Sequence, residues 1–536
     1  MLTSNYQKMK NYIKLFTAST LLVLGSCSND FLDTAPVTEK VSENFYTTPK
    51  DAFEGLVSIY DVLQQEGGWA GFQMITEEAS DNCFGGFGTA DGIAVLDWDR
   101  FKNSSDPEMN NVIWQSCYKG IYRANILLEN LDKVNWGADT ALKAKYEAEA
   151  RFLRAHFHFE LARIFGDIVP LDHSINTSEF NSPRLAPEVT YALIANDLKF
   201  AIENLGNENY SQVGNTNYGR ITKWAAESYL AKAFIFYTDY YTKPDLAGVV
   251  TKAQAVTYIN DVVNNSGHAL IADYSRLWLA ASLANYAGEG NTEMVWAIRY
   301  NGSGKGDWNL HEGNRLSVLI APRGGNIGRY AYGWGGLPVT PSLYNAYEVG
   351  DTRRDATIIN FAGEGLNFDP APNKRDQRQY TGYAWKKYCP VTNEAGIADV
   401  TANGGNFQID NVEDYAVIRF SDVLLMAAEL NLGTNDAFAK DCLDKVRDRA
   451  FQNANHRVAA NLPNIMKERQ LELALEGQRF FDLIRQSMAI TKAAIDNTNS
   501  DSQFNVTFRP ETLGWFAIPQ SQIVLSNGAI KQNPGW

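Results

Sequence analysis

Two stretches of this chain combine aromatic rings with polar side chains among glycines, a mixture that suits the binding of sugars. A sugar ring offers an apolar C–H face that stacks on a flat aromatic side chain, and hydroxyls that pair with amides and carboxylates. The first stretch spans residues 69–98 and the second spans residues 308–334. We predict that the ligand contacts lie among Trp69, Phe72, Asn82, Phe84, Trp98, Trp308, Tyr330, Tyr332 and Trp334.

The usual sequence signatures of catalysis and metal binding do not occur in the chain. There is no H-E-x-x-H or G-x-S-x-G motif, and only six histidines are present. His156 and His158 fall on one predicted helix about 200° apart around its axis, so they cannot jointly chelate a metal. We therefore predict a protein that is not an enzyme and that uses neither a cofactor nor a metal ion.

Glycoside hydrolysis stays open as an alternative, because it needs only two carboxylates on either side of a sugar bond. Such a pair could come from Glu77, Glu78, Asp81, Asp97 and Asp99. The same acidic segment could hold a calcium ion through oxygen ligands, although it lacks a calcium-loop motif. A chain with 62 acidic residues produces such clusters by chance, so non-catalytic binding is the preferred interpretation.

Charge and cysteine content exclude several other classes of protein. A net charge of -14 and a pI near 5.1 make nucleic acids and anionic membrane surfaces poor partners. The same charge disfavours strongly sulfated glycans, unless a local basic pocket outweighs it. After Cys27, the four remaining cysteines are widely separated and form no C-x-x-C pair, which indicates neither a zinc site nor a disulfide framework.

The N-terminus is typical of a lipoprotein signal peptide. Basic residues precede a short apolar run at 15–24, which suits the h-region of a signal peptide and is too short to span a bilayer. The run ends in Leu24-Gly25-Ser26-Cys27, which resembles the lipobox cut by the lipoprotein signal peptidase. We predict that Cys27 carries the lipid and that the polar, acidic residues behind it form a tether. The mature chain would be held to the membrane by this lipid alone.

Helical periodicity dominates both ends of the chain. The clearest predicted helix spans residues 141–165, where alanines at 148, 155 and 162 form a small-residue seam. Such seams let paired helices approach closely, as in helix-turn-helix repeats of about 34 residues. Further helices are predicted at 48–65, 110–131, 187–205, 222–241, 253–264, 418–430, 436–451 and 464–486.

The character of the sequence changes from about Tyr300 to Glu413, where glycines, aromatics and short β-type runs replace the helical period. A segment of this length exceeds an ordinary linker, so we interpret it as a loop-rich insertion into a helical scaffold. The predicted organisation is a signal peptide at 1–26, a tether at 27–42, a helical repeat region at 43–299, the insertion at 300–413, and a helical region with an extended tail at 414–536.

Five segments, in order along the chain, resemble sequence blocks of the SusD/RagB family. They begin at Tyr146, Gly219, Ile418 and Glu468, and the last comprises Ile518-Pro519 with the closing Gln532-Asn533-Pro534-Gly535-Trp536. The most specific block is Glu468 to Arg485, whose charged residues fall at three- and four-residue spacings that suit ion pairs along a helix. We interpret these charged residues as structural, so the blocks identify a fold and not a binding site.

The resemblance implies a mostly α fold, with a tetratricopeptide-like scaffold and a loop-rich insertion. It further implies a lipoprotein of the outer membrane that faces the cell exterior, in a system similar to the starch utilisation system. There it would capture oligosaccharide or polysaccharide and deliver it to a SusC-like TonB-dependent transporter. Two other binding roles stay open: a peptide receptor like the RagB members, and a helical-repeat adaptor whose aromatics are all buried.

Overall fold

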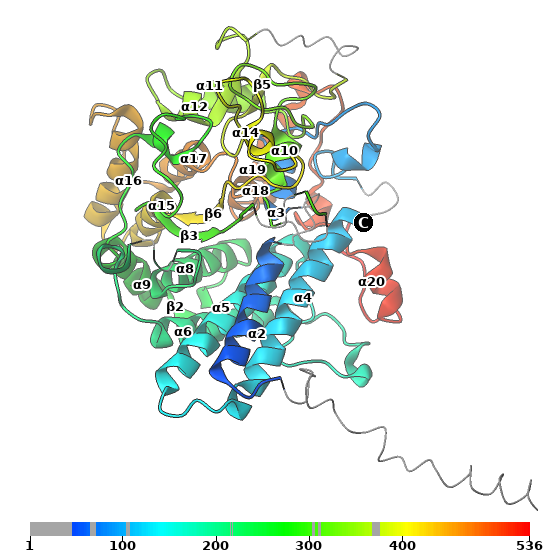
Figure 1. Ribbon diagram of the computed structural model, residues 1–536, viewed down its shortest axis with the longest axis vertical. Helices are drawn as coiled ribbons and strands as arrows, with labels where there is room; N and C mark the ends of the chain where they lie inside the picture. The colour runs from blue at the N-terminus through cyan, green and yellow to red at the C-terminus, as the bar shows by residue number, and fades with distance from the viewer. Residues whose placement is uncertain are drawn as a thin grey trace, which may run out of the picture.

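Long helices form one part of the molecule and loops form the other (Figure 1). The computed structural model describes residues 45–64, 71–102, 108–214, 216, 218–302, 306–308, 312–366 and 376–536. The predicted signal peptide, the predicted lipid-attachment residue Cys27 and the whole predicted tether lie outside these residues, as does Trp69. Within the described part of the chain, no helix has both the length and the apolarity needed to cross a bilayer.

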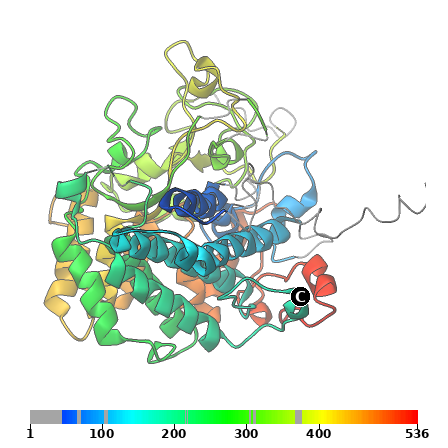
Figure 2. The ribbon, with the colours of Figure 1, turned by 60° about the horizontal axis from the view of Figure 1, so that its bottom comes forward.

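The N-terminal half is a stack of antiparallel helices, seen from a second side in Figure 2. Its short elements are α3 (Phe72–Glu78), η2 (Ile93–Leu96), η3 (Leu131–Lys133), η4 (Thr177–Glu179), α7 (Tyr210–Val213), η5 (Tyr274–Leu277) and the hairpin of β1 (Asp245–Leu246) and β2 (Val250–Thr251). Its long helices are α2 (Pro49–Gln64), α4 (Glu108–Asn130), α5 (Thr140–Phe165), α6 (Pro187–Asn204), α8 (Lys223–Tyr240) and α9 (Lys252–Asn265).

Local sequence explains where these helices begin and end. The side chain of Asp139 accepts a hydrogen bond from the backbone of Leu142 and caps α5, and Gly166 ends this helix at a φ of 70°. The predicted alanine seam is buried, so neighbouring helices approach α5 closely. Gly120 of α4 has the same role, because a Cβ there would meet the ring of Phe157 at 2.2 Å.

The loop-rich region lies beside the helices, over a two-stranded antiparallel pair of β3 (Met294–Ile298) and β6 (Tyr415–Arg419). These two strands join the helical N-terminal half to the C-terminal half. Between them the chain forms only short elements: α10 (Leu316–Ile320), α11 (Pro341–Ala346), α12 (Arg353–Thr357), α14 (Asp399–Ala402) and a second antiparallel pair, β4 (Ile358–Asn360) with β5 (Tyr383–Trp385).

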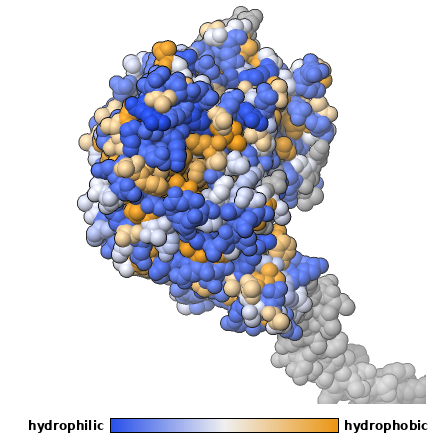
Figure 3. Space-filling view, turned by 90° about the vertical axis from the view of Figure 1, so that its left-hand side faces the viewer, coloured by the Kyte–Doolittle hydropathy of each residue, from blue (hydrophilic) through white to orange (hydrophobic). Residues whose placement is uncertain are grey.

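The C-terminal helices return beside the N-terminal ones, and α15 contacts α8 and α9. The face of the molecule on the left of Figure 1 is largely hydrophilic, with apolar groups gathered across its middle (Figure 3). The elements of the C-terminal part of the chain are α15 (Phe420–Asn431), α16 (Asp436–Phe451), α17 (Leu462–Glu472), α18 (Arg479–Ile484), α19 (Met488–Asp496), η6 (Asn499–Asp501), η7 (Pro510–Thr512) and α20 (Gln520–Leu525).

Two of the predicted C-terminal helices differ from the structure. Ile418 and Arg419, predicted to begin a helix, belong to β6, and α15 follows them. The single helix predicted at 464–486 is divided into α17 and α18, because Leu475 and Gly477 adopt positive φ. At Gly477 the backbone passes close to Gln73 and donates its N–H to Glu77, a contact that a continuous helix would not permit.

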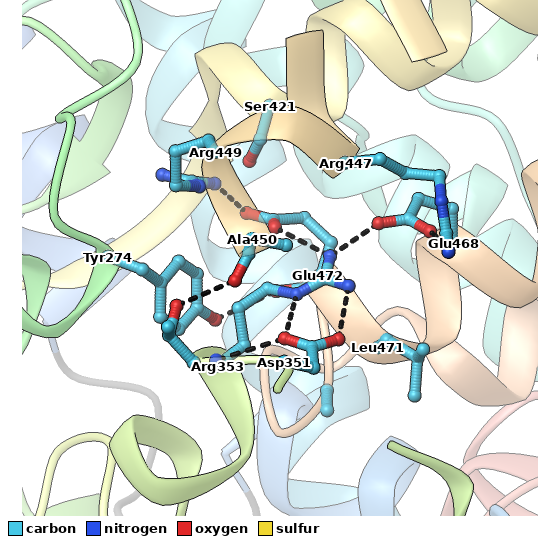
Figure 4. A network of polar contacts seen from close by, with 12 residues as sticks. Tyr274, Asp351, Arg353, Ser421, Arg447, Arg449, Ala450, Glu468, Leu471 and Glu472 are labelled. Atoms are coloured by element: carbon cyan, nitrogen blue, oxygen red, sulfur yellow. Dashed lines mark hydrogen bonds and ion pairs between the residues drawn. The ribbon is translucent and has the colours of Figure 1, made fainter. Parts of the chain in front are cut away.

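Most charged residues of the most specific family block pair differently from the prediction, because they bind partners from other elements. Asp482 and Arg485 do pair at the predicted three-residue spacing, at 3.0 Å. Glu468 and Glu472 of α17 accept hydrogen bonds from arginines of α12, α16 and β6 (Figure 4). Glu472 alone receives Arg449 at 2.6 Å, Arg419 at 2.9 Å and Arg353 at 3.1 Å.

We call this cluster the buried ion network. Five carboxylates and five cations make it up, so its formal charges balance. Burial lowers the pKa of Lys387 to about 8, and the neighbouring arginines hold the pKa of Glu472 far below its usual range. The network joins the insertion to β3, β6, α16 and α17 through Glu293, Asp351, Arg353, Lys387, Arg419, Arg447, Arg449, Glu468, Glu472 and Glu476.

Candidate ligand-binding site

Two adjoining surface hollows in the loop-rich region share Trp334 and Arg323 in their walls. Their volumes are about 490 and 450 Å³, which is within the usual range for sites that bind small molecules. Tyr332 and Phe407 line one of them, and Gln408 and Asp91 line the other. We call Tyr332, Trp334 and Phe407 the aromatic platform.

The backbone around Trp334 is held by the carbonyl groups at the C-terminal end of α10. The N–H of Trp334 donates to Val318, and the N–H groups of Gly333 and Gly335 donate to Pro322 and Ala321. A side chain at position 333 would meet the Val318 carbonyl at 2.3 Å, so glycine is required for this close approach. This clamp fixes the position from which the indole extends.

The second ring of the platform, Tyr332, lies two residues before Trp334, and the third, Phe407, comes from a distant part of the insertion. Tyr332 and Phe407 have ring centroids 4.4 Å apart at an angle of 40°. The amide of Asn326 accepts a hydrogen bond from the Tyr332 backbone, and the Phe407 carbonyl accepts one from Asn411. All three rings of the platform are half-buried, so each keeps part of its surface toward solvent.

Arg323 provides the charged group of the site. Its guanidinium donates to the carbonyl of Trp334 at 3.0 Å and to Asp91 at 3.4 Å, and it lies 3.8 Å from Asp376. A side chain at Gly88 would collide with this guanidinium, so the glycine opens the space that Arg323 occupies. Backbone hydrogen bonds from Phe87 to Gly335 link the segments that carry these groups.

The arrangement can bind a ligand, and the carboxylate that lines it, Asp91, is paired with Arg323 at 3.4 Å. It presents three partly exposed rings, a guanidinium, an amide and a carboxylate around open hollows. Glycines 92, 324 and 325 leave the floor and rim without side chains. This combination suits a flat ligand with an apolar face and hydroxyl groups at its edge.

The structure places the predicted site residues in several different environments. Tyr332 and Trp334 lie together on the platform, whereas Trp69 is outside the described residues. Trp308 is exposed, with 48% of its surface accessible, and the guanidinium of Arg315 lies 5.2 Å from its ring. Four predicted residues are in the core, where they face other side chains instead of solvent: Asn82, Phe84, Trp98 and Tyr330.

The buried members of this set have clear structural roles. Asn82 donates to Glu77 at 2.9 Å, the Trp98 indole donates to Asn110 at 2.9 Å, and the Tyr330 hydroxyl donates to Glu364 at 2.7 Å. These contacts satisfy polar groups that would otherwise be buried without partners. We therefore do not include these residues in the binding surface.

Phe72, the remaining predicted residue, faces the interior. Its ring stacks on Phe481 at 5.4 Å and lines an internal cavity of about 90 Å³ between the helices and the β3–β6 pair. His156 also lines this cavity and contacts the Tyr229 hydroxyl at 2.7 Å. Burial lowers the pKa of His156 to about 3, so the imidazole is neutral and does not act as a proton donor near neutral pH.

Four of the five carboxylates considered for glycoside hydrolysis are buried in the fold, and Asp97 is half-buried. Asp81 forms a bidentate pair with Arg479, at 2.6 and 2.8 Å, and Glu77 accepts from Asn82 and Gly477. Glu78 and Asp99 are fully buried, and burial raises the pKa of Asp99 to about 7. Among the described residues, no group of three or more histidine, cysteine or acidic side chains is arranged to hold a metal ion.

The residues around the hollows that were not among the predicted contacts include Asp91, Arg323, Phe407 and Gln408. A signal for two of them exists in the sequence Gly404-Gly405-Asn406-Phe407-Gln408, where an aromatic ring stands among glycines and amides. This is the same composition that indicated the two predicted stretches. Arg323 has no comparable signal, because its place beside Trp334 depends on the fold of the α10 exit.

Comparison with known proteins identifies the family. A family model described as "SusD family" matches residues 360–536, and one described as "Starch-binding associating with outer membrane" matches residues 30–235. A SusD-like protein of Bacteroides ovatus is 25% identical over 482 residues, which cover 88% of this chain and 81% of that protein. The chain belongs to the SusD-like family.

Solved SusD-like structures share the fold. A laminarin binding SusD-like protein superposes with a TM-score of 0.74 at 28% identity, covering 92% of this chain and 100% of that one. Surface glycan-binding protein A from Bacteroides thetaiotaomicron, solved in complex with laminarihexaose, superposes with a TM-score of 0.73 at 23% identity, covering 91% and 100%. The predicted mostly α, tetratricopeptide-like fold is therefore confirmed.

Membership in the SusD-like family also bears on function class and location. SusD-like proteins bind carbohydrates and are not enzymes, which agrees with the prediction of a non-catalytic chain. One of the two family descriptions associates these proteins with the outer membrane, the predicted compartment.

Proposed function

We propose that this SusD-like chain is a glycan-binding lipoprotein that captures oligosaccharide or polysaccharide on the aromatic platform. The observation that carries the proposal is the grouping of Tyr332, Trp334 and Phe407 beside Arg323 and around two hollows. The rings would stack on the C–H faces of successive sugar units. Arg323, Gln408 and Asp91 would pair with the hydroxyl groups at their edges.

A β-glucan is the first ligand class to test. The laminarin binding SusD-like protein is 28% identical over almost the whole chain, and laminarin is a β-glucan. A group of half-exposed rings suits a glucan chain better than it suits a peptide, whose recognition depends mainly on backbone hydrogen bonds. The relative supports this class of ligand without fixing the linkage that this chain prefers.

We further propose that the bound glycan is delivered to a SusC-like TonB-dependent transporter. The support is the family assignment together with the lipobox-like Leu24-Gly25-Ser26-Cys27 near the N-terminus. The lipid on Cys27 would anchor the chain in the outer membrane, with the platform facing the cell exterior. Replacing Cys27 by serine would then release the protein from the membrane fraction, which immunoblotting of fractionated cells measures.

Isothermal titration calorimetry with laminarihexaose and with other oligosaccharides tests the binding proposal. We expect binding without cleavage, and a loss of about 10- to 100-fold in affinity for Trp334→Ala, because such a ring contributes much of the energy of a binding surface. Product analysis by chromatography would detect any cleavage. Affinity for peptides in place of every glycan tested would overturn the proposal and favour a receptor like the RagB members.

A further inference from the structure

A third surface hollow, of about 440 Å³, is lined by cations and aromatic groups. Its walls come from two segments that are about 400 residues apart in the sequence, namely the end of the loop after η2 and the extended chain before η7. The first segment contributes Arg100, Phe101 and Lys102, and the second contributes Phe504, Asn505, Thr507 and Arg509. Among the described residues, no acidic side chain lines the hollow.

The most informative residue of this hollow is Arg100. Among the described residues its guanidinium has no ion pair, and its buried Nε has no hydrogen-bond partner. The guanidinium carbon lies 5.4 Å from the centroid of the Phe504 ring, so the cation is held beside an aromatic face. By contrast, the buried arginines of the ion network each bind two or more carboxylates.

The other two cations keep the hollow positive. Lys102 is exposed and forms no ion pair within the described part of the chain. Arg509 donates to the Phe101 carbonyl at 3.2 Å, which ties the two walls together, and to the exposed carboxylate of Glu511 at 3.1 Å. Three cations therefore face one carboxylate on the rim.

The nearest buried acid does not cancel this charge. Asp99 lies next to Arg100, accepts a hydrogen bond from the Gly85 backbone at 2.9 Å and leaves its other oxygen without a partner. Burial raises the pKa of Asp99 to about 7, so this carboxyl is partly protonated near neutral pH. Asp97, two residues earlier in the same loop, is half-buried and does not line the hollow.

We propose that this hollow binds an anionic group carried on a sugar, either a sulfate ester or a carboxylate. Arginine recognises both through charge-assisted hydrogen bonds, Phe504 offers a face for the sugar ring, and Asn505 and Thr507 can pair with hydroxyls. The chain as a whole carries a charge of -14 and repels anions, so a local group of unpaired cations is needed for such a ligand.

The position of the hollow relates it to the aromatic platform without making it part of that site. One segment, residues 84–102, supplies Asp91, Gly92 and Val95 to the platform hollow and Arg100 to Lys102 to the cationic hollow. Binding at the cationic hollow therefore does not require that the platform binds glycan, and each site has its own test.

The test compares small sugars that differ only in charge. Glucose 6-sulfate, glucuronate, glucose and inorganic sulfate are titrated into the purified full chain by calorimetry at constant ionic strength. We expect both charged sugars to bind, glucose to show no binding, and inorganic sulfate to bind more weakly than glucose 6-sulfate, because only the sugar contacts Phe504. Added salt should weaken the binding of both charged sugars.

Variants locate the binding. In Arg100→Gln with Lys102→Gln, the affinity for glucose 6-sulfate should fall by about 10-fold or more, because the charge-assisted contacts are lost. Within the described residues the Arg100 side chain makes no hydrogen bond, so this variant should keep its melting temperature. The matched control is Lys50→Gln with Lys252→Gln, which removes two positive charges from exposed positions on α2 and α9.

Three results would overturn the proposal. They are the absence of binding by both charged sugars, unchanged affinity in the Arg100 and Lys102 variant, and inorganic sulfate binding as tightly as glucose 6-sulfate. The last result would indicate a bare anion site with no part for the sugar. Unchanged laminarihexaose affinity in the same variant is expected, which separates this proposal from the function proposed for the platform.

Discussion

The buried ion network and the aromatic platform both draw residues from the loop-rich insertion, yet they treat their polar groups in opposite ways. In the network, Arg353, Arg419 and Glu472 are fully buried and every charge meets opposite charges within the protein. On the platform, half-buried rings and Arg323 face open hollows. The comparison shows that polar groups stabilise the fold when all their partners lie inside the protein. Polar groups that keep one side open to solvent can instead bind a ligand.

The energetic consequences differ in the same way. Removing one member of a balanced, buried ion cluster leaves a charge without a partner in a medium of low polarity, which is expensive for the folded state. Removing one ring from a surface platform exposes its neighbours to water that they already partly contact. Mutations in the two regions should therefore separate stability from binding, and four experiments test this contrast in order of expected effect.

The largest effect is expected for Glu472→Gln. Three arginines lose their shared carboxylate, so the free energy of unfolding should fall by about 3 to 5 kcal/mol. Urea unfolding followed by circular dichroism measures this change. The matched control is Asp441→Asn, which removes an exposed pair with Lys445 at 2.8 Å and should cost less than about 1 kcal/mol. Equal effects of the two substitutions would contradict the distinction.

Trp334→Ala should reduce ligand binding and leave stability almost unchanged. We expect laminarihexaose affinity to fall by about 10- to 100-fold, with little change in melting temperature. Trp308→Ala is the comparison, since Trp308 is also exposed in the insertion but does not line either hollow. Calorimetry on both variants measures how far the binding surface extends. Equal losses of affinity would indicate a surface that reaches Trp308, whereas a loss only in Trp334→Ala would indicate a surface limited to the platform.

Phe407→Ala tests how much another ring of the platform contributes to glycan affinity. The ring pairs with Tyr332 at 4.4 Å, so its loss should weaken glycan binding by about 3- to 10-fold, less than the loss of Trp334. Phe407→Tyr keeps the ring and should retain affinity. If Phe407→Ala binds as tightly as the parent chain, the ligand contacts Trp334 from the other hollow.

The smallest expected effect is on the pH dependence of stability. The folded pKa of Asp99, about 7, lies above its ordinary value near 3.8, so the folded state holds a proton that the unfolded state has released between these values. This contribution to stability is complete below about pH 4 and is lost as the pH rises through 7. Asp99→Asn removes it while keeping an acceptor for Gly85, so its melting temperature should depend less on pH between 5 and 8. An unchanged pH profile would contradict the shift.

Much of the helical scaffold could be predicted because its signals are local. The helix at Thr140–Phe165 was expected from its apolar period and ended at Gly166, and Asp436–Phe451 was predicted with the same bounds. The interruption of the helix predicted at 464–486 could not be predicted, because it depends on contacts with Gln73 and Glu77, which lie about 400 residues away in the sequence. Local periodicity carries no information about such a contact.

The site was predicted only in part. Aromatic rings among glycines and amides drew attention to Tyr332 and Trp334, which the structure places together on the platform. The same composition also selected Phe84, Trp98 and Tyr330, which the fold buries. Composition cannot separate these cases, since a large ring stabilises a core as readily as it binds a ligand.

The sequence by itself determined the helical character, the family and the balance of charge, because these follow from residue types and their spacing along one segment. Only the tertiary structure decided which rings stay exposed, which carboxylates pair with arginines, and where the described part of the chain leaves the Arg100 guanidinium without a carboxylate. Each of these depends on which distant segments meet. That pairing is fixed by the packing of the whole chain.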